Sequence, residues 1–221
     1  TALVFLPVLL LMLLAAGARK RDLLALALIG LMTTPVLWSQ MSREQRSRVT
    51  AMLQQTGAGE QPTSDGYHLH QAKRLIALGG WLGSATQGDA VDDIAAFRVP
   101  EPHTDSIFPV LGERFGICGM SLVLGLYLVL GWRGLAIADR TREPFGRLVA
   151  VGLSSLILIQ AIINTAMMVG LLPITGLALP LVSYGGSSML ANCIALGMLV
   201  NISRRPGYEM SDAPFRFSGA I

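Results

Sequence analysis

The residues best suited to chemistry lie in the stretch EPHTDSIF, residues 101–108, directly ahead of a long apolar run. Glu101, His103 and Asp105 place two carboxylates and an imidazole within five residues. A carboxylate can act as a general base when it lies within hydrogen-bond reach of the proton that it removes. With His68 and His70, the same groups offer ligands for a divalent metal ion. An H-x-H pair alone is a weak metal signal, because its two rings point apart on a helix.

A structural role for the same residues is also open. Thr104 or Asp105 is predicted to cap a helix that begins just after it, since both residue types are favoured at the N-cap. Pro109 agrees with this position, because proline is tolerated in the first turn of a helix. Glu101 and His103 can be solvated loop residues. Capping and catalysis are compatible, since a capping carboxylate is also held in place.

Composition sets the class of protein. Hydrophobic residues make up 52% of the 221 residues and charged residues only 14%, whereas soluble domains carry about 25% charged residues. This deficit, with its long uncharged runs, predicts an integral membrane protein. It argues against a soluble enzyme, and a net charge of +3 gives no indication of nucleic-acid binding.

The apolar runs predict an all-α polytopic membrane protein with about five transmembrane helices. Each run approaches the ~20 residues that a helix needs to cross a bilayer. The predicted membrane domain covers residues 1–205, and residues 206–221 form a polar cytoplasmic tail. The start at Thr1, with no Met and no polar lead, predicts that this chain is the tail of a longer protein. The expected spans are residues 2–17, 23–38, 107–138, 148–172 and 188–202.

Basic residues predict the orientation of these spans, because short cytoplasmic loops are enriched in Lys and Arg. The clusters follow the first span, the third and the fifth, so they share one side. Residues 41–106 then form one long extracytoplasmic loop, despite Arg43, Arg46 and Arg48 near its start. Within it, residues 66–83 predict a helix lying in the membrane interface. Lys73 and Arg74 on that helix either contact a phosphate or extend toward water.

A second unusual stretch is LLPITGLALPLVSYGGSSMLAN, residues 171–192, which carries no charge. Pro173 and Pro180 predict a re-entrant connection, and irregular backbone at membrane depth survives only where protein buries it or it lines a cavity. We therefore expect a cavity wall here and hypothesise a substrate groove. Ser187 and Ser188 are predicted to cap the next span. The candidate substrate contacts are Ser183, Tyr184, Gly185, Gly186, Ser187 and Ser188.

Polar residues inside the spans are further candidates. Gln160, Asn164 and Asn192 are expected to form hydrogen bonds between helices. Glu113 and Arg114, near the start of the third span, should pair or face a polar interior, because intramembrane ionisable groups are functional candidates.

Taken together, these blocks resemble the C-terminal half of the RodA/FtsW family of shape, elongation, division and sporulation (SEDS) proteins. The resemblance rests on GYHLHQAKRLIALGGWLG, PEPHTDSIFPVLGERFG and LLPITGLALPLVSYGGSSMLANCIALGMLVNI in that order. It implies a peptidoglycan glycosyltransferase of the bacterial cytoplasmic membrane that polymerises lipid II at the outer face. It also implies a class B penicillin-binding protein as partner, and no nucleic acid.

The resemblance further implies roles for single residues. The family's essential aspartate corresponds to Asp105, which we expect to act as the base on the acceptor hydroxyl. Glu101, His103 and Thr104 then become substrate contacts. Lys73, Arg74 or a divalent cation (Mg²⁺ or Mn²⁺) would stabilise the pyrophosphate leaving group. The protein itself is expected to contact membrane lipid.

Departures from the family pattern leave alternatives open. Ser106 stands where Phe is usual, GSATQG replaces a Gly-Lys-Gly-like stretch, and about five N-terminal spans are missing. A fragment, a split gene and a divergent homologue each explain these differences. The alternative functions are a lipid II flippase, consistent with broken helices around a cavity, and a non-catalytic membrane scaffold.

Overall fold

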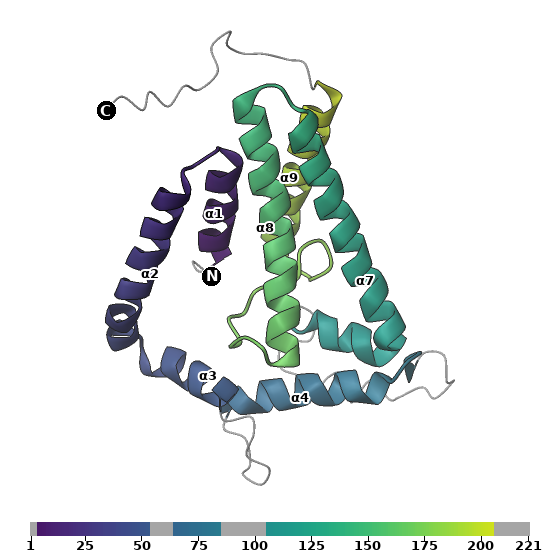
Figure 1. Ribbon diagram of the computed structural model, residues 1–221. Coiled ribbons are helices and arrows are strands. Elements are labelled where there is room, and N and C mark those ends of the chain that lie inside the picture. Colours follow the sequence, from purple (N-terminus) through teal and green to yellow (C-terminus); the bar gives the residue numbers. More distant parts are fainter. Residues whose placement is uncertain (1–3, 54–63, 85–104, 206–221) are drawn as a thin grey trace.

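The computed structural model describes residues 4–53, 64–84 and 105–205, and every regular element in these ranges is a helix (Figure 1). The predicted all-α fold is thus confirmed for the described part of the chain. The predicted tail at residues 206–221 lies outside it. The helices are α1 (Phe5–Ala15), α2 (Lys20–Gln40), α3 (Arg43–Leu53), α4 (Ser64–Gly79), α7 (Ile107–Arg140), α8 (Pro144–Val169) and α9 (Gly186–Arg204).

Three helices, α7, α8 and α9, are long and apolar enough to cross a membrane, as judged within the described residues. They match the last three predicted spans to within four residues at each end. The first two predicted spans correspond to α1, an apolar helix of 11 residues, and α2, with 21 residues. That α1 and α2 cross the bilayer stays a prediction.

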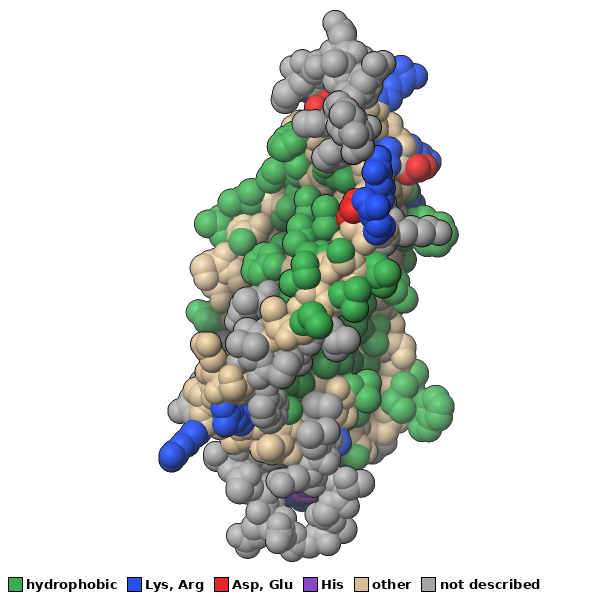
Figure 2. Space-filling view, turned by 60° about the vertical axis from the view of Figure 1, so that its left-hand side comes forward, with side chains coloured by type: hydrophobic (Ala, Val, Ile, Leu, Met, Phe, Trp, Pro, Cys, Tyr) green, Lys and Arg blue, Asp and Glu red, His purple; other side chains and the backbone are tan. Residues whose placement is uncertain are grey.

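The basic connections meet at one end of the bundle, as the charge pattern predicts. Arg147 Nη2 donates to the carbonyl of Ala15 at 3.0 Å, which joins the α1–α2 turn to the α7–α8 turn. A Cβ on Gly146 would lie 4.0 Å from Ile202 Cγ2, which adds the end of α9. Figure 2 shows Lys and Arg at both ends of the molecule with hydrophobic side chains between them.

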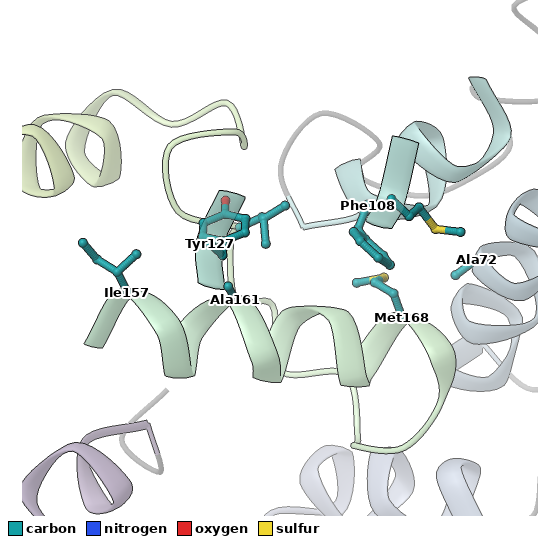
Figure 3. Packing of buried hydrophobic residues seen from close by; sticks show 8 residues of the cluster. Ala72, Phe108, Tyr127, Ile157, Ala161 and Met168 are labelled. Atoms are coloured by element: carbon teal, nitrogen blue, oxygen red, sulfur yellow. The ribbon is translucent and has the colours of Figure 1, made fainter. Parts of the chain in front are cut away.

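Helix α8 is the centre of the fold. Ile157 and Ala161 pack against Tyr127 of α7, while Met168 packs near Phe108 of α7 and Ala72 of α4 (Figure 3). A Cβ on Gly134 would lie only 1.9 Å from Ser154 Oγ, so this glycine permits the close approach of α7 and α8. Small residues serve this purpose generally in membrane helix packing.

Helix α7 is long because it consists of two helical parts joined by a bend at Gly116. Its φ of 64° and ψ of −164° lie in a region that essentially only glycine adopts. The break leaves the N–H groups of Ile117 and Cys118 without helical partners, and they donate to the carbonyls of Gly80 (3.0 Å) and Trp81 (3.2 Å). The first part of α7 therefore lies beside α4, and the second part crosses the bundle (Figure 1).

Helix α4 lies across the end of the bundle opposite the basic turns (Figure 1). Leu69, Ala72 and Leu75 form its buried face, and Trp81 beyond its end is 75% exposed. The predicted amphipathic helix is confirmed, and its place in the membrane interface stays a prediction. The neighbouring α3 covers Arg43–Leu53.

Candidate functional site

Asp105 lies in the turn before α7, with its side chain half-buried. The N-cap residue of α7 is Ser106, which makes no side-chain cap hydrogen bond, so the prediction that Thr104 or Asp105 occupies the cap position is wrong. Helix α7 begins after Ser106, so Asp105 lies one residue ahead of the cap position. The Asp105 carboxylate lies near the connection after α8, where Oδ2 is 3.1 Å from the position that a Cβ on Gly176 would occupy.

That segment, residues 170–185, joins α8 to α9 without regular secondary structure. Leu177, Leu179 and Pro180 are buried, and the Tyr127 hydroxyl donates to the Pro180 carbonyl. Tyr127 lies 11 residues beyond the bend at Gly116, or roughly 16 Å along the helix at 1.5 Å per residue. Half the thickness of a hydrocarbon core is about 15 Å, which agrees with a re-entrant connection. The irregular, partly buried backbone is as predicted, and its entry into the membrane stays a prediction.

A pocket of about 560 Å³ opens where this segment meets the start of α7. Of the six candidate substrate contacts at residues 183–188, four line it, whereas Ser187 and Ser188 do not. Ile107, two residues after Asp105, brings the start of α7 to its wall. Sequence reasoning missed the apolar residues of the pocket wall, although Val182 and Met189 both lie in the charge-free stretch at residues 171–192. The lining residues are Ile107, Val182, Ser183, Tyr184, Gly185, Gly186 and Met189.

The two serines do not cap α9. Its N-cap is Gly185, with no side-chain cap hydrogen bond, and the helix begins at Gly186. Ser187 and Ser188 therefore already lie in the first turn, where Ser188 Oγ donates back to the Gly185 carbonyl at 3.1 Å. Ser183 is the serine with a role in this segment, because its Oγ accepts from the Leu179 N–H at 2.8 Å.

Asn164 of α8 connects these parts. Its side chain is fully buried, and Nδ2 donates to the Asp105 carbonyl at 3.1 Å and to the Leu177 carbonyl at 2.5 Å. Asn164 does form hydrogen bonds, but its partners are two non-helical carbonyls, one of them that of the candidate base, and not a second helix as expected. The only signal was an amide inside an apolar run.

Lys73 and Arg74, the basic residues predicted to contact substrate, do not line the pocket. Lys73 and Arg74 are exposed on α4, whose buried face is turned to α7 and α8. His68 is half-buried and His70 exposed. Between residues 4 and 205, leaving out 54–63 and 85–104, no three His, Cys, Asp or Glu side chains gather as metal ligands. Glu101, His103 and Thr104 lie outside the described residues, so the divalent cation stays a prediction.

Glu113 agrees with the expected polar surrounding. It is 4% exposed, and Ser84 Oγ donates to its Oε1 over a long 3.4 Å. Arg114 is exposed. Both lie in the first part of α7, where it packs against the turn after α4. A Cβ on Gly83 would lie 2.1 Å from the Arg114 carbonyl, so this contact requires glycine.

The fold and site define a multi-pass helical membrane protein with an acidic residue held against a re-entrant segment. The family pattern described as cell cycle protein FtsW/RodA/SpoVE matches residues 1–207, and the chain belongs to this family. Over 196 residues it is 40% identical to a Geobacter sulfurreducens protein named "Probable peptidoglycan glycosyltransferase FtsW". Over 198 residues it is 38% identical to "Stage V sporulation protein E" of Bacillus subtilis.

A solved structure described as "Structural coordination of polymerization and crosslinking by a peptidoglycan synthase complex" has the same fold. The TM-score is 0.74 at 29% identity, covering 93% of this chain and 55% of that chain. The two curated relatives are matched over 88–89% of this chain. The chain spans about half the length of these relatives, 50% of one and 52% of the other.

Proposed function

We propose that this chain carries the catalytic base of a peptidoglycan glycosyltransferase that polymerises lipid II into glycan strands. The carrying observation is that the Asp105 carboxylate lies beside residues 170–185, with Oδ2 3.1 Å from where a Cβ on Gly176 would stand. The pocket beside the start of α7 offers room for a substrate next to that turn. Relatives named peptidoglycan glycosyltransferase and membership of the family support the assignment.

The proposed reaction transfers a sugar with inversion. Asp105 removes the proton from the acceptor hydroxyl as that oxygen attacks the anomeric carbon of the donor. The bond from this carbon to the pyrophosphate oxygen breaks, and lipid pyrophosphate leaves with both electrons of the bond. Pyrophosphate needs no proton to leave, so the second carboxylic acid of glycoside hydrolysis is unnecessary. Lys73, Arg74 or Mg²⁺ or Mn²⁺ would stabilise the departing charge.

The pocket lining suits an amphiphilic substrate. Ile107, Val182 and Met189 offer apolar contact for a lipid chain, and Ser183, Tyr184 and the Gly185–Gly186 backbone offer hydrogen bonds. Tyr184 is 80% exposed, so its hydroxyl remains accessible. A mostly apolar pocket with a few polar groups is a typical arrangement for ligand recognition.

The charge pattern supports the proposed location. The basic turns lie at the end opposite α4 and the start of α7 (Figure 1), and basic turns mark the cytoplasmic side. We therefore assign the site to the outer face of the cytoplasmic membrane of a bacterium. A class B penicillin-binding protein is the proposed partner, supported by the similarity to a complex described as coordinating polymerization and crosslinking.

The test is Asp105→Asn in the full-length protein, with purified lipid II and glycan length as readout. Loss of a general base typically costs about 10²–10⁴-fold in rate, and we expect a loss in that range. Asp139→Asn, an exposed acid at the opposite end of α7, is the matched control and should keep its activity. Polymerisation by Asp105→Asn at the wild-type rate would exclude the base role. Lipid II movement across proteoliposomes without polymerisation would favour transport instead.

A further inference from the structure

We infer that Asn164 is a positioning residue that holds Asp105 against the re-entrant segment. This inference rests on the proposed function, because it assigns Asn164 a role through the base. Asn164 itself is buried in α8 and does not line the pocket. Its action on the reaction must therefore pass through the groups that it binds.

The contacts of Asn164 determine its orientation. Both neighbours, the carbonyls of Asp105 and Leu177, are acceptors, so the side-chain NH₂ must face them. A flipped amide would place its oxygen against two other oxygens. One side chain thus supplies a donor to the turn before α7 and a donor to the re-entrant segment.

A third contact completes the arrangement. Leu177 follows Gly176, and Gly176 is the residue against which the Asp105 carboxylate lies. Gly176 has φ +67°, a conformation that side-chain-bearing residues rarely adopt. The Asp105 carbonyl is thus bound by Asn164, and its carboxylate lies where a side chain on Gly176 would meet it. Three separate parts of the chain meet there.

The unpaired atom of Asn164 distinguishes this role from ordinary packing. Its Oδ1 is buried with no hydrogen-bond partner in the described structure. A buried polar atom without a partner costs free energy, whereas a leucine of similar shape would have none to satisfy. The amide is thus an unfavourable choice for filling space, and the two bonds from Nδ2 are what it provides.

The predicted consequence is specific to the rate of the chemical step. Removing the donors frees the Asp105 turn to shift, and a displacement of about 1 Å in a catalytic group can cost roughly 10²-fold in rate. Substrate affinity should change little, because Asn164 does not line the pocket. We therefore expect kcat to fall and KM to stay nearly constant.

The experiment compares Asn164→Leu with Gln160→Leu in the full-length protein. Leucine keeps the branching of asparagine and suits a membrane span, so a merely structural role would leave kcat unchanged. Gln160 lies one turn earlier on α8, half-buried, and controls for placing leucine there. We expect Asn164→Leu to lower kcat by roughly 10²-fold, with KM and the thermal unfolding midpoint near those of Gln160→Leu. Asn164→Ala should show the same kinetic pattern.

The outcomes separate this inference from the proposed function. An inactive Asp105→Asn beside a fully active Asn164→Leu overturns the positioning role and leaves the proposed function intact. An active Asp105→Asn overturns the proposed function, whatever Asn164→Leu does. A loss of kcat that only accompanies a lowered unfolding midpoint in both Asn164 variants also overturns positioning, since it marks a structural role.

Discussion

The two connections on either side of α8 differ in length, charge and burial. Residues 141–143 join α7 to α8 with three residues, whereas residues 170–185 join α8 to α9 with sixteen. Helix connections in bundles commonly need only 2–8 residues. The first connection contains Arg142 and Glu143, while the second has no charged residue. A simple turn between two consecutive helices therefore does not require a connection as long as residues 170–185.

The two connections also satisfy their polar groups differently. In the short one, neighbours in sequence suffice: Thr141 Oγ1 donates to the Ile137 carbonyl at 2.7 Å, and Glu143 accepts from the Gly146 N–H. In the long one, Tyr127 of α7 and Asn164 of α8 reach buried carbonyls. Buried backbone without water must find protein partners. The comparison teaches that the short connection is locally encoded, while the long one depends on the assembled helices.

The largest effect should follow from changing Gly176 in the long connection. Gly176→Ala adds a Cβ 3.1 Å from Asp105 Oδ2 at a φ of +67°, so the carboxylate or the backbone must move. We expect roughly 10²-fold lower lipid II polymerisation, in line with about 1 Å of displacement. Gly17→Ala is the control, because Gly17 has φ +81° with nothing within 4 Å. Equal losses of activity in Gly176→Ala and Gly17→Ala would show that the long connection has no particular role in polymerisation.

An intermediate effect on stability is expected from Tyr127→Phe. The change leaves the buried Pro180 carbonyl without its donor, at a cost of about 1–3 kcal/mol. Unfolding in detergent by a chemical denaturant measures this loss. Tyr184→Phe, at an 80% exposed tyrosine, should change stability by less than about 0.5 kcal/mol. A Tyr127→Phe protein as stable as wild type would show that the buried segment does not rely on α7.

The smallest effect should come from the short connection. Glu143→Ala removes the side chain that accepts from Gly146 N–H at the start of α8, which should cost about 1 kcal/mol of stability. Polymerisation should not change, because this turn lies at the end opposite Asp105. Glu143→Gln keeps an acceptor and should be closer to wild type in the same unfolding measurement. Loss of activity in Glu143→Ala with stability retained would contradict the local role assigned here.

Much of the fold was predictable because local physics sets it. Apolar runs gave α7, α8 and α9, and the amphipathic pattern gave α4. The absence of charge in residues 170–185, with Pro173 and Pro180, predicted a buried irregular connection. The helix starts were harder: one or two residues separate the predicted and observed caps of α7, and the serines expected to cap α9 lie within it. Cap positions depend on backbone geometry that residue type alone does not decide.

The sequence by itself determined the membrane class, the grouping of the basic turns at one end, and Asp105 as the candidate base. Only the tertiary structure decided that Asp105 lies beside Gly176 and that Asn164 binds both segments, across separations of 59 and 13 residues. Hydrophobic runs and charge patterns act through contact with lipid and water. Each run can therefore be recognised in the sequence without knowing what it packs against. A hydrogen bond between distant segments exists only after the helices have packed, and no local pattern specifies its partner.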